Sequence, residues 1–265
     1  MKKTIILLLF FITAVSFAHE FWIQPDKFIY KRGQTINLRF LVGENFAGKN
    51  WTGNKEKVQT LHLYFDDAID SNLIDNLTKN KGDSIQFAIY EEGTAMVTLH
   101  TKNSFIDLEA KDFNAYLQEE GLTEALEYRK ANGDTTKNGT ERYQRCVKTI
   151  FQVGKNKNHV FKKRTILPLD IIPDENPYAV AKDGKLKLRV LFQGNALKKT
   201  KIKVWHRANK KVSAVDYETD DEGEVKIFLS LRGEWMVSCV KMVRLEDDPD
   251  AEWQSYWGSL TWGYY

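Results

Sequence analysis

Residues 219–235 read TDDEGEVKIFLSLRGEW, and this stretch places a strand signal between two turn signals. The first turn signal is the Asp- and Gly-containing run 220–223, and the second is Arg232-Gly233-Glu234. Between them, residues 224–229 give a strand signal, and residues 224–227 alternate polar and apolar side chains. Residues 235–243 then give another strand signal. The stretch therefore predicts antiparallel strands joined by short turns.

Two more strand signals precede this stretch, at residues 186–192 and 201–206, with a Gly194-Asn195 turn between them. Short strands at this spacing are typical of a compact β-sandwich. The order of the turns and strands resembles the small transthyretin-like or carboxypeptidase-regulatory-like sandwich. That resemblance implies a scaffold or a binding module, because a fold alone does not fix a function.

The first half of the chain shows the same alternation of polar and apolar residues. Residues 35–42, 60–65, 84–90 and 94–100 each have the pattern, and a turn-like Glu-Glu-Gly separates the last two. An alternation of this kind is typical of half-buried antiparallel sheet.

The period changes to that of a helix between residues 107 and 133. Gly121 marks a break, so that one or two short helices are expected there. Residues 140–153 fit either a helix or a strand, and the β-branched content of their second half favours a strand.

The chain divides into a leader and two β domains. Residues 1–18 combine two lysines, an apolar stretch and small residues at the −3 and −1 positions, as a signal peptide does. The charged, Asn-rich run 154–163 is typical of a linker or a long hairpin. The predicted fold is therefore mainly β, with two β-sandwich domains at residues 19–163 and 164–265 and a short helical insertion in the first.

The leader and the charge balance limit the classes of partner that the protein can have. Removing Lys2 and Lys3 from 39 basic residues leaves 37 against 36 acidic residues, so we expect no nucleic-acid partner. No later apolar stretch approaches the roughly 20 residues of a membrane span. We therefore expect a soluble periplasmic or secreted protein with no membrane insertion after signal cleavage. Cys146 and Cys239 could form a disulfide in such a compartment or stay as two separate buried thiols.

His19 becomes the first residue if the signal peptidase cuts after Ala18. Its free α-amine and its Nδ1 atom can then close one chelate ring on a metal, which no internal histidine can do. Such nitrogen ligands suit Cu, Ni or Zn, and the Irving–Williams order favours Cu(II). Glu20 could add a carboxylate to this site, or it could be an ordinary surface acid.

Three other histidines are candidate completing ligands. His62 and His100 lie opposite the apolar faces of their strands, so each is either an exposed strand residue or a second arm of the site. His206 shares a face with apolar residues, which indicates a histidine at the edge of a core. His159 lies in the charged linker and is expected to be solvated.

No catalytic motif stands out in the sequence. It has no Gly-x-Ser-x-Gly elbow, no His-Glu-x-x-His helix and no phosphate-binding glycine loop, so we do not expect an enzyme. The aromatic residues Trp253, Tyr256, Trp257 and Trp262 fit either a sugar-stacking platform or packing of a last strand on the sandwich.

Several segments together resemble a bacterial exported family known as domain of unknown function 4198, often labelled a periplasmic component of cobalt or nickel transport. They are AHEFW (18–22), VGE (42–44), YLQEEGL (116–122), ERY (141–143), NPY (176–178) and WQSYWGSLT (253–261). The resemblance implies that His19 is the family's starting histidine. It also implies a His-Met pair on a late strand, where this chain has Lys241-Met242.

These observations lead to one main hypothesis and two rivals. The protein is expected to bind a transition metal ion (Ni, Co or Cu) through His19, with Glu20, His62, His100 or His206 as further ligands, and to assist a membrane metal-uptake system. The alternative is a non-catalytic β-sandwich module that binds a glycan or a protein. A copper oxygenase would require a second imidazole beside His19.

Overall fold

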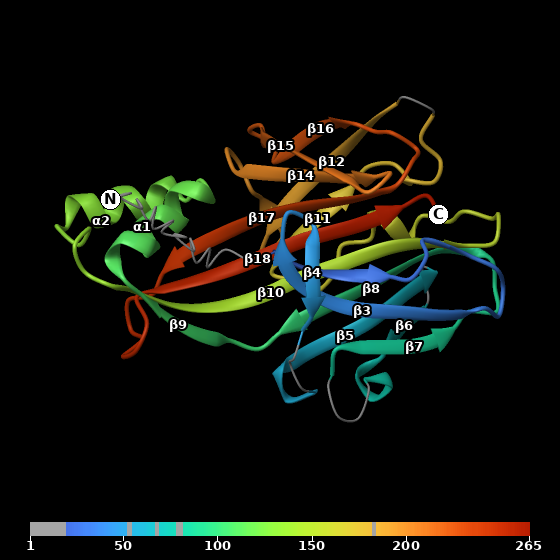
Figure 1. The fold of residues 1–265 in the computed structure, drawn as a ribbon, viewed down its shortest axis with the longest axis horizontal. Coiled ribbons are helices and arrows are strands. Elements are labelled where there is room, and N and C mark those ends of the chain that lie inside the picture. The colour runs from blue at the N-terminus through green and yellow to red at the C-terminus, as the bar shows by residue number, and fades with distance from the viewer. Residues whose placement is uncertain (1–19, 52–54, 67–68, 78–81, 182–183) are drawn as a thin grey trace, which may run out of the picture.

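The computed structural model of the protein describes residues 20–51, 55–66, 69–77, 82–181 and 184–265 (Figure 1). The predicted signal peptide and His19 lie outside these residues. The described chain is mainly β and forms a β-sandwich fold with two α-helices, as predicted. Neither helix is long and apolar enough to cross a membrane, within the ranges described.

A ten-stranded central sheet connects the two halves of the chain. Its main path is β15 (Lys211–Glu218), β14 (Lys201–Ala208), β17 (Glu234–Arg244), β18 (Trp253–Gly263), β10 (Gly139–Val153), β8 (Gly93–Thr101), β5 (Val58–Asp66) and β6 (Ile69–Asn72). The short strands β2 (Ile29–Tyr30) and β9 (Ser104–Leu108) also pair with β10.

The last strand, β18, joins these halves by pairing in parallel with β10, with Glu141 opposite Trp253 and Arg145 opposite Trp257. Its other edge pairs with β17 in antiparallel fashion. The two predicted domains therefore share one sheet, and the boundary after residue 163 stays a prediction.

Two smaller sheets cover opposite faces of the central sheet. The N-terminal sheet holds β1 (Glu20–Pro25), β3 (Thr35–Glu44), β4 (Ala47–Asn50) and β7 (Ser84–Ala88). The C-terminal sheet holds β11 (Leu169–Pro173), β12 (Lys185–Phe192), β13 (Asn195–Ala196) and β16 (Glu224–Phe228). Three short 3₁₀ turns, η1 (Lys55–Lys57), η2 (Ile74–Asn76) and η3 (Val160–Lys162), complete the described elements.

The alternation along β10 explains how one strand serves two cores. Val147 and Phe151 pack with the N-terminal sheet, whereas Cys146 and Ile150 belong to the core under the C-terminal sheet. Successive side chains of a strand point to opposite faces, so this part of β10 contributes apolar side chains to both cores. The predicted strand at residues 140–153 is confirmed.

Residues 84–90 and 94–100 are adjacent in sequence but lie in different layers. β7 pairs with β3 in the N-terminal sheet, whereas β8 pairs with β5 and β10 in the central sheet. The turn at Gly93 therefore carries the chain from one layer to the other rather than closing a hairpin.

The two cysteines are free and buried. Cys146 and Cys239 both lie opposite Gly258, one on each side of β18. Two residues separated by an intervening strand are about 10 Å apart, which is beyond the Cα separation that a disulfide tolerates. They are two separate thiols in the core.

The helical insertion forms α1 (Ala110–Glu119) and α2 (Thr123–Ala131), which confirms the predicted helices. Gly121 lies between them with a φ of 69°, a left-handed conformation that favours glycine. The helices pack on the central sheet through Val240, Met242 and Trp253. Because Trp253 lies opposite Glu141, the helices and the N-terminal sheet cover the same face of the central sheet at different places.

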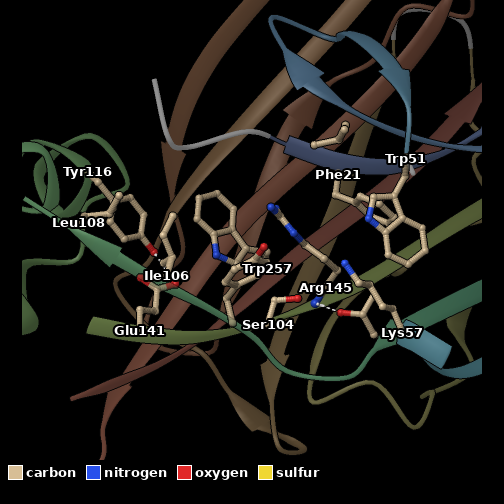
Figure 2. Close-up of a pocket in the computed structure, with 13 residues that line it drawn as sticks. Phe21, Trp51, Lys57, Ser104, Ile106, Leu108, Tyr116, Glu141, Arg145 and Trp257 are labelled. Carbon is tan, nitrogen blue, oxygen red and sulfur yellow. Dashed lines mark hydrogen bonds between the residues drawn. The ribbon is translucent and has the colours of Figure 1, made fainter. Parts of the chain in front are cut away.

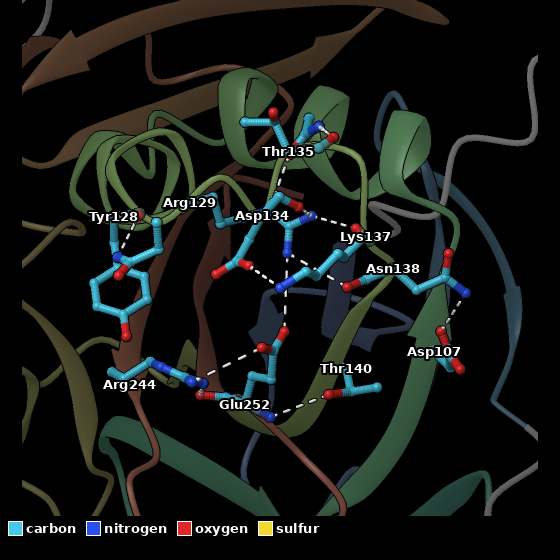
Figure 3. A network of polar contacts seen from close by, with 12 residues as sticks. Asp107, Tyr128, Arg129, Asp134, Thr135, Lys137, Asn138, Thr140, Arg244 and Glu252 are labelled. Atoms are coloured by element: carbon cyan, nitrogen blue, oxygen red, sulfur yellow. Dashed lines mark hydrogen bonds and ion pairs between the residues drawn. The ribbon is translucent and has the colours of Figure 1, made fainter.

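Arg129 holds the two helices and the loop that follows them (Figure 3). Its guanidinium is 1% exposed and donates hydrogen bonds to the main-chain oxygens of Asp134 and Lys137. It also donates to Asn114 Oδ1 on α1 at 3.0 Å and lies 3.9 Å from Glu252 of the segment before β18. This buried cation therefore fixes α1 against the sheet.

Candidate functional site

The helices and the N-terminal sheet leave a pocket of about 410 Å³ between them, on the central sheet. Its floor is formed by Glu141, Tyr143 and Arg145 of β10, which share one face because they alternate along the strand. Trp257 of β18 extends this floor from the position opposite Arg145. Side chains of β9, which pairs with the first part of β10, continue it on the other side.

Aromatic rings line the two ends of the pocket (Figure 2). Tyr116 of α1 stacks on Trp257 with 5.6 Å between ring centroids and 10° between planes. Phe21 of β1 meets Trp51 edge to face at the other end, 5.3 Å away. The rings therefore hold one another in place.

Arg145 lies among these rings. Its Cζ atom is 4.9 Å from the Trp257 centroid, 5.2 Å from Tyr143 and 5.8 Å from Phe21, which are cation–π distances. Figure 2 places Trp257 between Tyr116 and Arg145. Both faces of the Trp257 indole are therefore covered, and only its edge lines the pocket.

Glu141 is the acidic group of the pocket, and it is 2% exposed. Its Oε1 accepts hydrogen bonds from the hydroxyls of Ser255 and, at 3.5 Å, Tyr116. Its Oε2 is buried and has no hydrogen-bond partner within the described ranges. Burial raises the pKa of this carboxyl from 4.5 to about 7, although hydrogen bonding by Ser255 and the Arg145 charge oppose the rise.

A second polar group lies where β1 begins, beside the pocket. Glu20 is 8% exposed, and burial raises its pKa to about 7. Burial also raises the pKa of Glu120, at the end of α1, and the two carboxylates repel each other. Lys203 of β14 lies 3.9 Å from Glu120 Oε1 and partly offsets this repulsion. A smaller cavity touches both Glu20 and Glu120, and Phe21 and Trp257 line both cavities.

Of the predicted metal ligands that lie in the described residues, only Glu20 lies beside the pocket. His19 lies outside the described residues, directly before Glu20. His62 stacks on Tyr64, and His100 is buried with a ring nitrogen 3.0 Å from Gln144 Oε1. Burial lowers the pKa of His100.

His206 stacks on Trp235 at 4.1 Å and contacts the main-chain oxygen of Arg232 at 2.8 Å. Strand alternation places His62, His100 and His206 on the C-terminal-sheet face, the side opposite to Glu20. In the described part of the chain, no three His, Cys, Asp or Glu residues are grouped as a metal site would require.

The four aromatic residues predicted to cluster on the last strand lie in different surroundings. Trp253 and Trp262 are buried, and Tyr256 packs against Phe192 of the C-terminal sheet. Only Trp257 reaches the pocket.

Sequence reasoning missed Arg145, Glu141 and Glu120 as site residues. A signal was present, because the first half of β10 is mostly polar, whereas its second half is mostly apolar. Five of the six segments that carry the family resemblance each supply a residue to one of the two adjoining cavities, namely 18–22, 42–44, 116–122, 141–143 and 253–261.

Residues 16–242 match the family model described as domain of unknown function (DUF4198). The chain belongs to the DUF4198 family. No curated protein matches it at a significant level.

Among solved structures, the D0-D1 domain of Intimin has 12% identity and a TM-score of 0.22, covering 92% of this chain and 97% of that one. A DUF3823 family protein from Bacteroides uniformis has 12% identity and a TM-score of 0.22, covering 94% of this chain and all of that one. The trypsin-activated alpha-2-macroglobulin from Escherichia coli has 8% identity and a TM-score of 0.21, with 94% of this chain and 16% of that one covered.

Proposed function

We propose that this DUF4198 protein is an exported, non-catalytic binding protein that takes up a transition metal ion at its mature N-terminus and passes it to a membrane uptake system. The observation that carries the proposal is a pair of shielded carboxylates that line the same small cavity, Glu20 at the start of β1 and Glu120 at the end of α1. Glu20 directly follows the residue that signal cleavage would turn into a chelating terminus. The family's transport label supports the uptake role.

The donor set fits the chemistry of the proposed ion. His19 would supply its amine and imidazole nitrogens, and Glu20 and Glu120 would supply carboxylate oxygens. Mixed nitrogen and oxygen ligands suit Ni(II) and Cu(II). A divalent cation would also relieve the repulsion between the two carboxylates.

Lys203 also contributes to the charge around the two carboxylates. Its ammonium lies beside Glu120, and a bound ion would compete with it for that carboxylate. The structure places His62, His100 and His206 on the opposite face of the sheet, so the proposal does not use them.

Titration of the correctly processed protein with Ni(II), Co(II) and Cu(II) tests the proposal. His19→Ala and Glu120→Gln should each weaken binding at least about ten-fold, because each removes a ligand. The matched control is Glu127→Gln, an exposed carboxylate on α2, which should leave binding unchanged. Absence of binding, or binding that His19→Ala does not alter, would end the proposal.

A further inference from the structure

We propose that the outer edge of β15 is a dimerisation surface, on which β15 of a second copy of the chain pairs in antiparallel orientation. β15 is the last strand at one side of the central sheet, and among the strands that the structure describes it pairs only with β14. This inference does not depend on the metal proposal, because no described residue of β15 lines either cavity.

The edge that β15 presents is long and accessible. Proteins usually shorten an edge strand or interrupt it with proline, because its outward N–H and C=O groups invite another strand to pair. The opposite edge of the central sheet follows this rule, since β6 has four residues. β15 has eight residues without proline or glycine, and seven of them are exposed, including Val212 and Val215. The strand is therefore open to pairing along its whole length.

The hairpin that joins β14 to β15 fixes which main-chain groups point outward. Its two turn residues, Asn209 and Lys210, have φ values of 51° and 63°, as in a type I′ turn. The residues that flank such a turn, Ala208 and Lys211, exchange hydrogen bonds, and pairs of this kind alternate along the ladder. Residues 212, 214, 216 and 218 therefore direct their N–H and C=O groups away from β14.

The charges along the edge suit an antiparallel copy of the same strand. Basic residues, Lys210 and Lys211, stand at its start, and acidic residues, Asp216 and Glu218, stand at its end. A parallel copy would place like charges side by side, whereas an antiparallel copy brings the basic start of each strand to the acidic end of the other. Asp216 already pairs with Lys201 at 2.8 Å, so Glu218 is the carboxylate that the second copy meets.

A register centred on Ala214 satisfies both the outward groups and the charges. It places Ala214 opposite its own copy on the two-fold axis, Val212 opposite Asp216 of the second copy, and Lys210 beside Glu218 of the second copy. Residues 212, 214 and 216 then exchange about six main-chain hydrogen bonds with the second copy. The two central sheets would continue through the axis as one.

A disulfide trap tests this register. Opposite Cα atoms in a hydrogen-bonded antiparallel pair are about 5.5 Å apart, which a disulfide can span. The mature Ala214→Cys protein should therefore form a covalent dimer on mild oxidation, seen on a non-reducing gel. Val212→Cys is the matched control, because the two copies of residue 212 would lie more than about 13 Å apart. Cys146 and Cys239 are buried, so the wild type should not cross-link.

Sedimentation of the mature protein in EDTA measures the association itself and excludes bridging by metal ions. The wild type should show a concentration-dependent dimer. Ala214→Lys should weaken this dimer at least about ten-fold, because it places two like charges on the axis. Val212→Lys, the same change on the same strand, should keep the dimer, because its lysine would lie opposite Asp216.

Three results would each overturn the assignment. They are a wild type that stays monomeric at every concentration tested, equal cross-linking of Ala214→Cys and Val212→Cys, and a loss of dimer in Val212→Lys as large as in Ala214→Lys. An equimolar mixture of Ala214→Lys and Ala214→Glu should recover the dimer, because opposite charges then meet on the axis.

Discussion

Raising the pH should destabilise the wild-type protein more than its Glu141→Gln variant. Burial raises the pKa of Glu141 from 4.5 to about 7, so the folded protein holds this proton more tightly than the unfolded chain. Below the ordinary pKa both states are protonated. Between the two values only the unfolded chain releases the proton, so the free energy of unfolding falls as the pH rises.

The size of the effect follows from the two pKa values. Their difference corresponds to about 3 kcal/mol, most of which is lost between about pH 5 and about pH 8. The amide that replaces the carboxyl in the Glu141→Gln variant does not titrate, so the variant lacks this loss. Other titrating groups are common to both proteins and cancel in the difference.

Urea denaturation of both proteins across this pH range measures the effect. The difference in the free energy of unfolding, variant minus wild type, should rise by about 2–3 kcal/mol from about pH 5 to about pH 8. Glu119→Gln serves as the control, because this carboxylate is exposed. A Glu141→Gln difference that stays constant with pH would refute the idea that Glu141 is a desolvated acid.

Three further predictions concern buried or shielded charges. Lys148→Met should lower the free energy of unfolding by about 3–5 kcal/mol, because it leaves Asp170 buried without its cation, and adding Asp170→Asn should recover part of the loss in urea denaturation. Arg129→Met should accelerate amide hydrogen exchange throughout α1 and α2, whereas unchanged exchange would show that its hydrogen bonds do not hold the helices. Lys203→Met should tighten Ni(II) binding about ten-fold in calorimetry because it removes a competing cation from Glu120, and weaker binding would contradict that role.

The strands and helices could be predicted because each depends on a local period. The alternation at residues 224–227 and the break at Gly121 are both present in the structure. The parallel pairing of β10 with β18 could not be predicted, because it joins segments more than 100 residues apart and leaves no local pattern. The separation of β7 and β8 into two layers was missed for the same reason, since alternation does not identify the partner strand.

The candidate site was harder to predict than the fold. Glu20 could be predicted as a site residue because it lies directly after the signal peptide. Glu120 could not, because only the packing of α1 on the central sheet brings it to Glu20. The polar first half of β10 was a signal for Glu141 and Arg145 that sequence reasoning missed. Glu141 and Arg145 are enclosed because α1 and β1 pack over this part of the central sheet. That packing cannot be read from any single segment of the sequence.

The most direct test of the metal proposal compares two N-termini. Both proteins begin at His19, as mass spectrometry of the secreted product should confirm, and the second carries an acetyl group on the His19 amine. Acetylation keeps the imidazole but removes the amine as a metal ligand. The proposal predicts that Ni(II) or Cu(II) affinity falls at least about ten-fold in the acetylated protein. Equal affinities would contradict it.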